Sequence, residues 1–180
     1  MNFFITNGTA EYMIKRYLEI GTDKLILLQG DDTHVLIEET TGKGHFANPR
    51  KYEIMHSSGT LQQDGIALLT HVHVDKEDRL EFEKQAYSLC QDALLLKGLM
   101  AFRILKPIKA NTYCIYTQWH DEADVEMWHL MKQDLPQPNI AYNANIFISK
   151  NYTKKYLVPK LEDIYLSLEL TLGIADDQDN

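Results

Sequence analysis

Between Ile66 and Val158, strand-like and helix-like spacings of apolar residues follow one another in an order that few folds share. A β-rich run at 66–74 is followed by a stretch whose apolar residues recur at helical spacing. These residues are Phe82, Ala86, Leu89, Cys90, Ala93 and Leu94. Lys97 and Gly98 are expected to end this helix. One face of the helix must therefore be buried.

Two further β-rich runs, at 102–105 and 113–117, are separated by a loop that begins with a proline and predict a hairpin. A second helix is expected at about 121–132, because Pro136 and Pro138 follow and cannot continue it. The order so far is therefore strand, helix, strand, strand, helix.

A last strand, at 145–149 or at 156–158, completes this order. The resulting β-α-β-β-α-β arrangement is the split-βαβ pattern, so we predict an α+β fold of the ferredoxin-like type. Residues 161–172 are apolar enough to pack against the rest of the chain, but their pattern does not distinguish a helix from a strand.

Residues 1–62 predict a smaller, mostly β module. A strand at 3–6 precedes a helix that Gly21 ends, and strands at 25–28 and 35–37 flank a Gly-Asp-Asp-Thr turn. One face of that helix is expected to carry Tyr12, Met13, Ile14, Tyr17 and Leu18.

Three parts of the chain follow from these patterns. We expect an N-terminal β-rich module at 1–62, a ferredoxin-like domain at 63–159, and a C-terminal extension with an acidic tail at 160–180. The whole chain has 180 residues, of which 44% are hydrophobic, and this is enough apolar material for a packed core.

The charge and composition exclude several classes of partner. The formal net charge is −8 and Lys and Arg do not cluster, which argues against nucleic acid. We find no apolar run long enough to cross a membrane and no secretory signal, and therefore expect a cytoplasmic protein without a membrane partner. Cys90 and Cys114 fit no metal-ligand spacing and are expected to be reduced, buried thiols.

No familiar catalytic motif occurs in the sequence. A Gly-rich phosphate loop, a Gly-x-Ser-x-Gly turn and a paired-cysteine motif are all missing, which argues against conventional nucleotide chemistry and triad hydrolysis. His71 and His73 lie two apart on one expected strand, so both should point to the face opposite Thr70. They are expected to line the interface between the modules, and we predict no metal site.

Several sequence words occur in order in the second module: Phe82-Glu83-Lys84, Gly98-Leu99, Arg103-Ile104-Leu105-Lys106-Pro107, and Tyr113-Cys114-Ile115-Tyr116-Thr117-Gln118-Trp119. Together with Trp128 on the second helix, they resemble the framework of the antibiotic biosynthesis monooxygenase (ABM) domain family. With the β-rich module in front, the chain is similar to the two-module subgroup, which includes heme-degrading enzymes and TRAP-like regulatory proteins. The resemblance implies a ferredoxin-like domain of the dimeric α+β barrel type.

The resemblance also implies site residues. Heme-degrading members use an Asn on the first strand of the domain, a Trp on the second helix and a His after that helix, and these positions fall at Thr70, Trp128 and Pro138. Only the Trp matches. We therefore predict catalytic roles for Trp128 and Thr70, with Trp128, His129 and Tyr142 as ligand-binding residues.

Two functions are compatible with this sequence. The first is a monooxygenase-like protein that binds a flat apolar small molecule such as heme, as ligand or substrate, with oxygenase activity weakened by the two missing groups. The alternative is a non-enzymatic, TRAP-like regulatory or stress protein. In either case the first module should cover the sheet face that single-module relatives bury by dimerising, which predicts a monomer with pseudo-dimeric modules.

Overall fold

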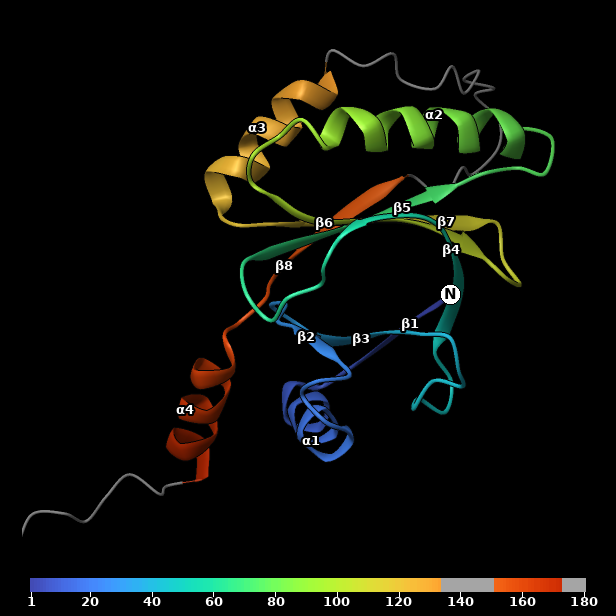
Figure 1. Ribbon diagram of the computed structural model, residues 1–180. Helices are drawn as coiled ribbons and strands as arrows, with labels where there is room; N and C mark the ends of the chain where they lie inside the picture. The colour runs from blue at the N-terminus through green and yellow to red at the C-terminus, as the bar shows by residue number, and fades with distance from the viewer. Residues whose placement is uncertain (134–150, 173–180) are drawn as a thin grey trace, which may run out of the picture.

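The computed structural model describes residues 1–133 and 151–172 of the chain (Figure 1). These residues form an α+β structure with a single eight-stranded sheet and four helices, which confirms the predicted fold class. The elements in chain order are β1 (Asn2–Gly8), α1 (Ala10–Ile20), β2 (Ile26–Leu28), β3 (His34–Thr40), β4 (Arg50–Gly59), β5 (Ile66–His73), α2 (Arg79–Ala93), β6 (Leu99–Pro107), β7 (Thr112–Trp119), α3 (Glu122–Gln133), β8 (Tyr152–Leu157) and α4 (Leu161–Leu172).

The sheet is antiparallel throughout and runs across the predicted boundary between the modules. Its strand order is β2-β3-β1-β4-β6-β7-β5-β8, with β4 pairing β6 from Tyr52–Pro107 to Gly59–Ala101. The two edges also meet, because Gln29 and Leu157 exchange both backbone hydrogen bonds, at 2.7 and 3.0 Å. The sheet therefore closes on itself as a barrel within one chain.

A side-chain clamp supports this closure. The Gln63 amide donates to the carbonyl oxygens of Leu27 and Pro159, at 2.9 and 2.8 Å, and its own oxygen accepts from the Leu27 N–H at 2.8 Å. Leu27 lies on β2, and Pro159 lies two residues after the end of β8. One half-buried amide thus ties the two sheet edges together.

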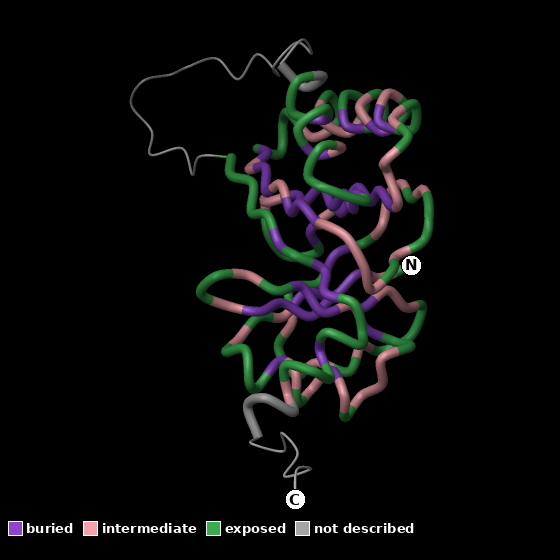
Figure 2. Tube along the Cα trace, turned by 90° about the vertical axis from the view of Figure 1, so that its left-hand side faces the viewer, coloured by how far each residue is buried: buried purple, intermediate pink, exposed green. Residues whose placement is uncertain are grey.

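Alternation along the strands separates two apolar layers. Side chains on the inner face of the barrel form one cluster: Phe3, Ile5, Leu28, Val35, Ile37, Tyr52, Ala67, Leu69, Ala101, Leu105, Cys114, Tyr116, Tyr156 and Val158. The outer face of β5, β6 and β7 packs under α2 and α3, as Figure 1 shows. We call this outer face the helix-covered face. Buried residues follow the strands between these layers (Figure 2).

A third cluster lies outside the barrel, where α1 packs on β2 and β3. Met13 and Tyr17 are buried there, and Gly21, with a φ of 125°, ends the helix as predicted. The structure also shows that residues 161–172 are a helix, which the sequence pattern left open, and Ile164 of this helix packs into the same cluster.

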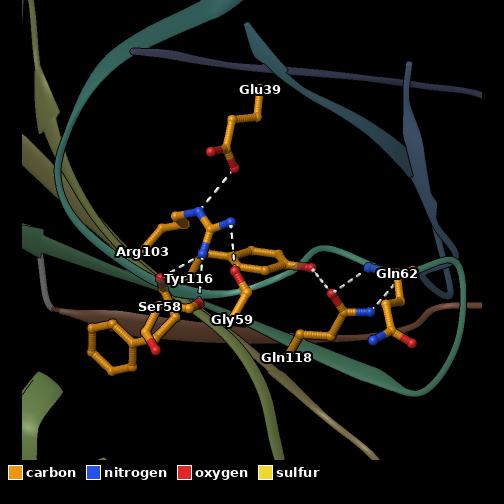
Figure 3. A network of polar contacts seen from close by, with 8 residues as sticks. Glu39, Ser58, Gly59, Gln62, Arg103, Tyr116 and Gln118 are labelled. Atoms are coloured by element: carbon orange, nitrogen blue, oxygen red, sulfur yellow. Dashed lines mark hydrogen bonds and ion pairs between the residues drawn. The ribbon is translucent and has the colours of Figure 1, made fainter. Parts of the chain in front are cut away.

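A polar network lies inside the barrel near one end (Figure 3). The Arg103 guanidinium donates to Glu39 of β3 at 2.8 Å and to the carbonyl oxygens of Ser58, Phe102 and Gly59. Beside it, the Gln118 amide donates to the carbonyl oxygens of Gln62 and Asp64 and accepts from the Tyr116 hydroxyl. Residues from both predicted modules thus share one buried network.

Several expectations about single residues are corrected. Tyr12 was placed on the buried face of α1 but is 56% exposed, and Leu94 lies beyond the end of α2 and is 44% exposed. The last strand is β8, at Tyr152–Leu157, whereas the alternative at 145–149 lies outside the described residues. Cys90 and Cys114 are free and buried, as predicted.

The four helices of the described residues are 11, 15, 12 and 12 residues long. None of these helices is long and apolar enough to cross a membrane.

Candidate functional site

Trp128 lies at the centre of the helix-covered face. Its indole is only 1% exposed and packs against Trp119 of β7, with ring centroids 5.4 Å apart, and edge-on against Phe102 of β6 at 6.4 Å. The Trp119 indole N–H donates to the Thr117 hydroxyl at 2.8 Å, which fixes the orientation of that ring. The predicted Trp position is therefore part of a rigid aromatic wall.

Thr70 lies on the same face of the sheet. Its neighbour Leu68, two residues earlier on β5, packs in the Trp128 cluster, as does Ile115, the cross-strand partner of Thr70 on β7. The Thr70 hydroxyl forms a 2.9 Å hydrogen bond with the Thr153 hydroxyl on β8. The hydroxyl that was expected to meet a ligand is thus already paired with a neighbouring strand.

Strands β5 and β8 form a partly exposed platform beside α3. Lys155 of β8 reaches Glu122 at the start of α3, with the Nζ and Oε1 atoms 2.7 Å apart, and both side chains are exposed. Thr70, Thr153 and this ion pair lie in one row along the edge of the wall that contains Trp128. We call this row the β5–β8 platform.

The remaining predicted site residues are not brought to this platform. His129 follows Trp128 on α3 but is exposed where Trp128 is buried, since successive residues of a helix point about 100° apart. Tyr142 and Pro138 lie outside the described residues. The described part of the site therefore supplies an apolar wall and hydroxyl groups, and none of the three described residues predicted for the site offers an iron ligand there.

A second concave site lies at one end of the barrel, opposite the end with the Arg103 network. It has a volume of about 870 Å³ and lies among the loop at 43–49, the start of β4, the end of β5, the β6–β7 hairpin and Tyr152. His71 and His73 both line it, which confirms that they point away from Thr70 and toward the first module. We call this site the barrel mouth.

His71 is the most unusual residue of the barrel mouth. It is 4% exposed, its ring packs on Tyr152 with centroids 4.8 Å apart, and its Nδ1 atom has no hydrogen-bond partner. Burial, assisted by the nearby charges of Arg50 and Lys154, lowers the pKa of His71 to about 4, so the imidazole is neutral at pH 7. A buried nitrogen without a partner costs about 1–3 kcal/mol of stability.

Sequence reasoning missed the other residues of the barrel mouth. Arg50, Tyr52 and Tyr152 are far from His71 in the chain and are joined to it only by the strand order of the closed sheet. The adjacent Arg50 and Lys51 were the one local signal, and two neighbouring cations are too common to indicate a site.

Known proteins that resemble this chain share its sequence at low identity. No family model matches the chain. It is 24% identical over 125 residues to the heme-degrading monooxygenase of Listeria monocytogenes, which covers 69% of this chain and 75% of that protein. It is 23% identical over 164 residues to the signal transduction protein TRAP of Staphylococcus aureus, which covers 87% of this chain and 96% of that protein.

The fold comparison agrees with the sequence comparison. A ferredoxin-fold protein related to antibiotic biosynthesis monooxygenases, from Listeria monocytogenes, superimposes with a TM-score of 0.73 over 88% of this chain and 94% of the other, at 23% identity. This chain has the fold of the ABM-related proteins. The resemblance predicted from the sequence is thereby confirmed, and the ABM relatives include both an enzyme and a regulator.

Proposed function

We propose that this protein is an ABM-type binding protein that holds a flat apolar ligand such as heme at the β5–β8 platform, with oxygenase activity weak or lost. The hydrogen bonding of the Thr70 hydroxyl is the observation on which this proposal rests. This hydroxyl lies beside the aromatic wall and shares a 2.9 Å hydrogen bond with the Thr153 hydroxyl in which either oxygen can be the donor. Thr70 therefore has at most one proton to donate to an oxygen ligand, and Thr153 competes for it, whereas an Asn amide would offer two.

The wall itself supports ligand binding. Trp119 and Phe102 pack their rings against Trp128 of α3, and all three are buried, so they form a rigid apolar backing behind the platform; apolar, aromatic surroundings with few polar groups are typical of small-molecule sites. A heme bound at the platform would supply redox and oxygen chemistry, whereas the protein residues described here position and desolvate the ring. The described residues therefore suit the flat porphyrin ring of heme, and they provide no ligand for its iron.

Both named relatives bear on the alternative function. One is a heme-degrading monooxygenase and the other a signal transduction protein, and their identities to this chain are 24% and 23%. Loss of turnover with retention of ligand binding would also suit a TRAP-like regulatory role. The two functions differ in what happens to a bound ligand, and this difference can be measured.

The experiment compares hemin with iron-free protoporphyrin IX in optical titrations of the whole protein. Because binding is proposed to depend on the ring and not on an iron ligand, the two dissociation constants should agree within about threefold. Trp128→Phe, which keeps an apolar ring, should weaken both to a similar degree, and His120→Gln, at an exposed residue, should change neither. Hemin binding more than about thirtyfold tighter than protoporphyrin would show an iron ligand and contradict the proposal.

A further inference from the structure

We propose that the barrel mouth is a second binding site, specific for a small organic anion with a flat apolar body, such as an aromatic carboxylate. It lies at the end of the inner face of the barrel, whereas the β5–β8 platform lies on the outer face, so the two sites are independent. Its volume of about 870 Å³ is in the range of small-molecule pockets.

The charge of the lining is opposite to that of the protein. Lys43, Arg50, Lys51 and Lys109 line the mouth, and no Asp or Glu lines it among the described residues. The chain as a whole has a formal net charge of −8. Two carboxylates lie beside the mouth: Asp75 contacts His73 at 3.4 Å, and the buried Glu38 contacts the ring of His45, in the loop at 43–49, at 2.7 Å. A concave site lined by one sign of charge concentrates its field on a bound ion of the other sign.

Arg50 is the cation best placed to hold an anion. Burial raises the pKa of Tyr52, and the neighbouring Arg50 charge offsets part of this rise. The same guanidinium acts on His71, so it lies beside both inner-face residues at the mouth. Arg50 is an exposed residue, and its side chain also hydrogen-bonds that of Tyr52. A planar guanidinium with free N–H groups binds carboxylates with two parallel hydrogen bonds.

His71 provides the second observation that points to a ligand. A neutral imidazole has one N–H donor, and Nδ1 of His71 is buried without a partner. In the tautomer with its proton on Nδ1, the ring has a donor that no protein atom satisfies. Buried polar atoms are almost always paired, so an unpaired one in a concave site indicates a missing partner.

The apolar part of the lining sets the shape of the ligand. Phe46, Pro107 and Ile108 line the mouth together with the ring of Tyr152, which is 44% exposed and already packed on His71. A small inorganic ion would leave these apolar surfaces uncovered. An aromatic carboxylate can stack its planar ring on Tyr152 while its carboxylate group binds Arg50. The site therefore fits an anion with an apolar body.

The test is calorimetric titration of the full-length protein with three probes: 2-naphthoate, the uncharged 2-naphthalenemethanol, and inorganic phosphate. Naphthoate is expected to bind at least tenfold tighter than either of the others. Arg50→Gln should weaken naphthoate at least tenfold, while Lys15→Gln, at an exposed lysine of α1, should leave it unchanged. Arg50 is exposed, so its replacement should not disturb folding.

A second measurement follows the His71 ring by NMR through its imidazole nitrogens. Saturating naphthoate should shift the His71 nitrogen signals and leave those of His120 in place. Naphthoate binding that is no tighter than that of the alcohol, or that survives Arg50→Gln, would overturn the proposal. Phosphate binding as tight as naphthoate would overturn the assignment of an apolar body.

Discussion

Arg103 carries the most concentrated set of buried polar contacts among the residues described. Its side chain is 5% exposed and donates to one carboxylate and three backbone carbonyl oxygens, from β3, β4 and β6. Removing one partner of such a set leaves the others buried and unpaired, which is more costly than the net contribution of the intact contacts. Arg103 should therefore affect stability far more than any surface cation.

We predict that Arg103→Met lowers the free energy of unfolding by about 3–5 kcal/mol, because it leaves the Glu39 carboxylate and three carbonyl oxygens without their donor. Urea denaturation at pH 7 measures this loss. Arg16→Met is the matched control, since Arg16 forms an ion pair with the exposed Glu19 on the surface of α1, and should change the value by less than about 1 kcal/mol. Equal effects of the two substitutions would contradict the structural role of Arg103.

His71 predicts a pH dependence of stability. Its pKa is about 4 in the folded protein against an ordinary value of 6.5, so between these values the unfolded chain binds more protons. The free energy of unfolding should therefore rise with pH from about 4 to 6.5, by up to about 3 kcal/mol from this residue, and be fully present above that range. His71→Gln should flatten this rise in urea titrations at pH 4.5 and 7.5.

The control for this pH effect is His120→Gln. His120 has a 73% exposed side chain, so its replacement should leave the slope between pH 4.5 and 7.5 as in the unmodified protein. A slope that persists unchanged in His71→Gln would show that other groups cause it.

At the scale of elements, Ile164 is the one buried residue of α4 among residues 161–168, the part of the helix whose burial is described. Ile164 is buried among Met13, Tyr17, Leu25, Leu27 and Leu36, whereas Tyr165 and Leu166 on the same helix are exposed. A helix of this length gains its stability in a protein from packing rather than from its own hydrogen bonds. Substitutions at Ile164 should therefore lower the stability of the protein, whereas substitutions at the exposed Leu166 should have little effect.

We predict that Ile164→Ala destabilises the protein by about 2–4 kcal/mol, through lost burial and the cavity that remains. Leu166→Ala, at a residue that is 56% exposed, should change the free energy of unfolding by less than about 0.5 kcal/mol. Thermal or urea unfolding compares the two. Similar effects of both substitutions would show that α4 packs differently.

The elements that the sequence predicted are those with a clear local period. The helices α1 and α2 and the β6–β7 hairpin follow from apolar spacing and from turn residues, and the opposed directions of Thr70 and His71 follow from strand alternation. The identity of α4 did not follow, because residues 161–172 are apolar without one decisive period. Strand β8 was predicted only in part, as the alternative at 156–158, since Lys154 and Lys155 interrupt the apolar pattern of its earlier residues.

Of the two candidate sites, one was predicted from the sequence and the other was not. Trp128 and Thr70 were found through family resemblance, and the structure places both on one face. The barrel mouth was not found, because Arg50, His71 and Tyr152 come from three strands whose adjacency depends on pairing over long sequence distances. Such pairing leaves no signal within a short window of sequence.

On the scale of the whole molecule, one closed sheet joins the two predicted modules. Strand β4 pairs both β1 and β6, and the Arg103 network crosses the same boundary. The division at residue 62 stays a prediction about sequence modules. A sheet shared in this way leaves neither part with a complete core of its own.

We therefore predict a single cooperative thermal transition in calorimetry and a solution mass near the 20.8 kDa of one chain, because the inner sheet face is covered from within the chain. Residues 63–160 expressed alone should be poorly soluble, since loss of β1 to β4 would uncover that face. Two well-separated transitions, or a mass near twice that of one chain, would count against this arrangement.

The proposed balance between binding and turnover is tested most directly by following bound hemin aerobically with ascorbate, with catalase present to remove free peroxide. Because the Thr70 hydroxyl is paired with Thr153 and His129 is exposed on α3, we predict that the Soret band remains essentially unchanged over many minutes. Repeated, catalase-resistant loss of the Soret band, with more than one hemin consumed per protein, would contradict this prediction and establish an active heme-degrading enzyme.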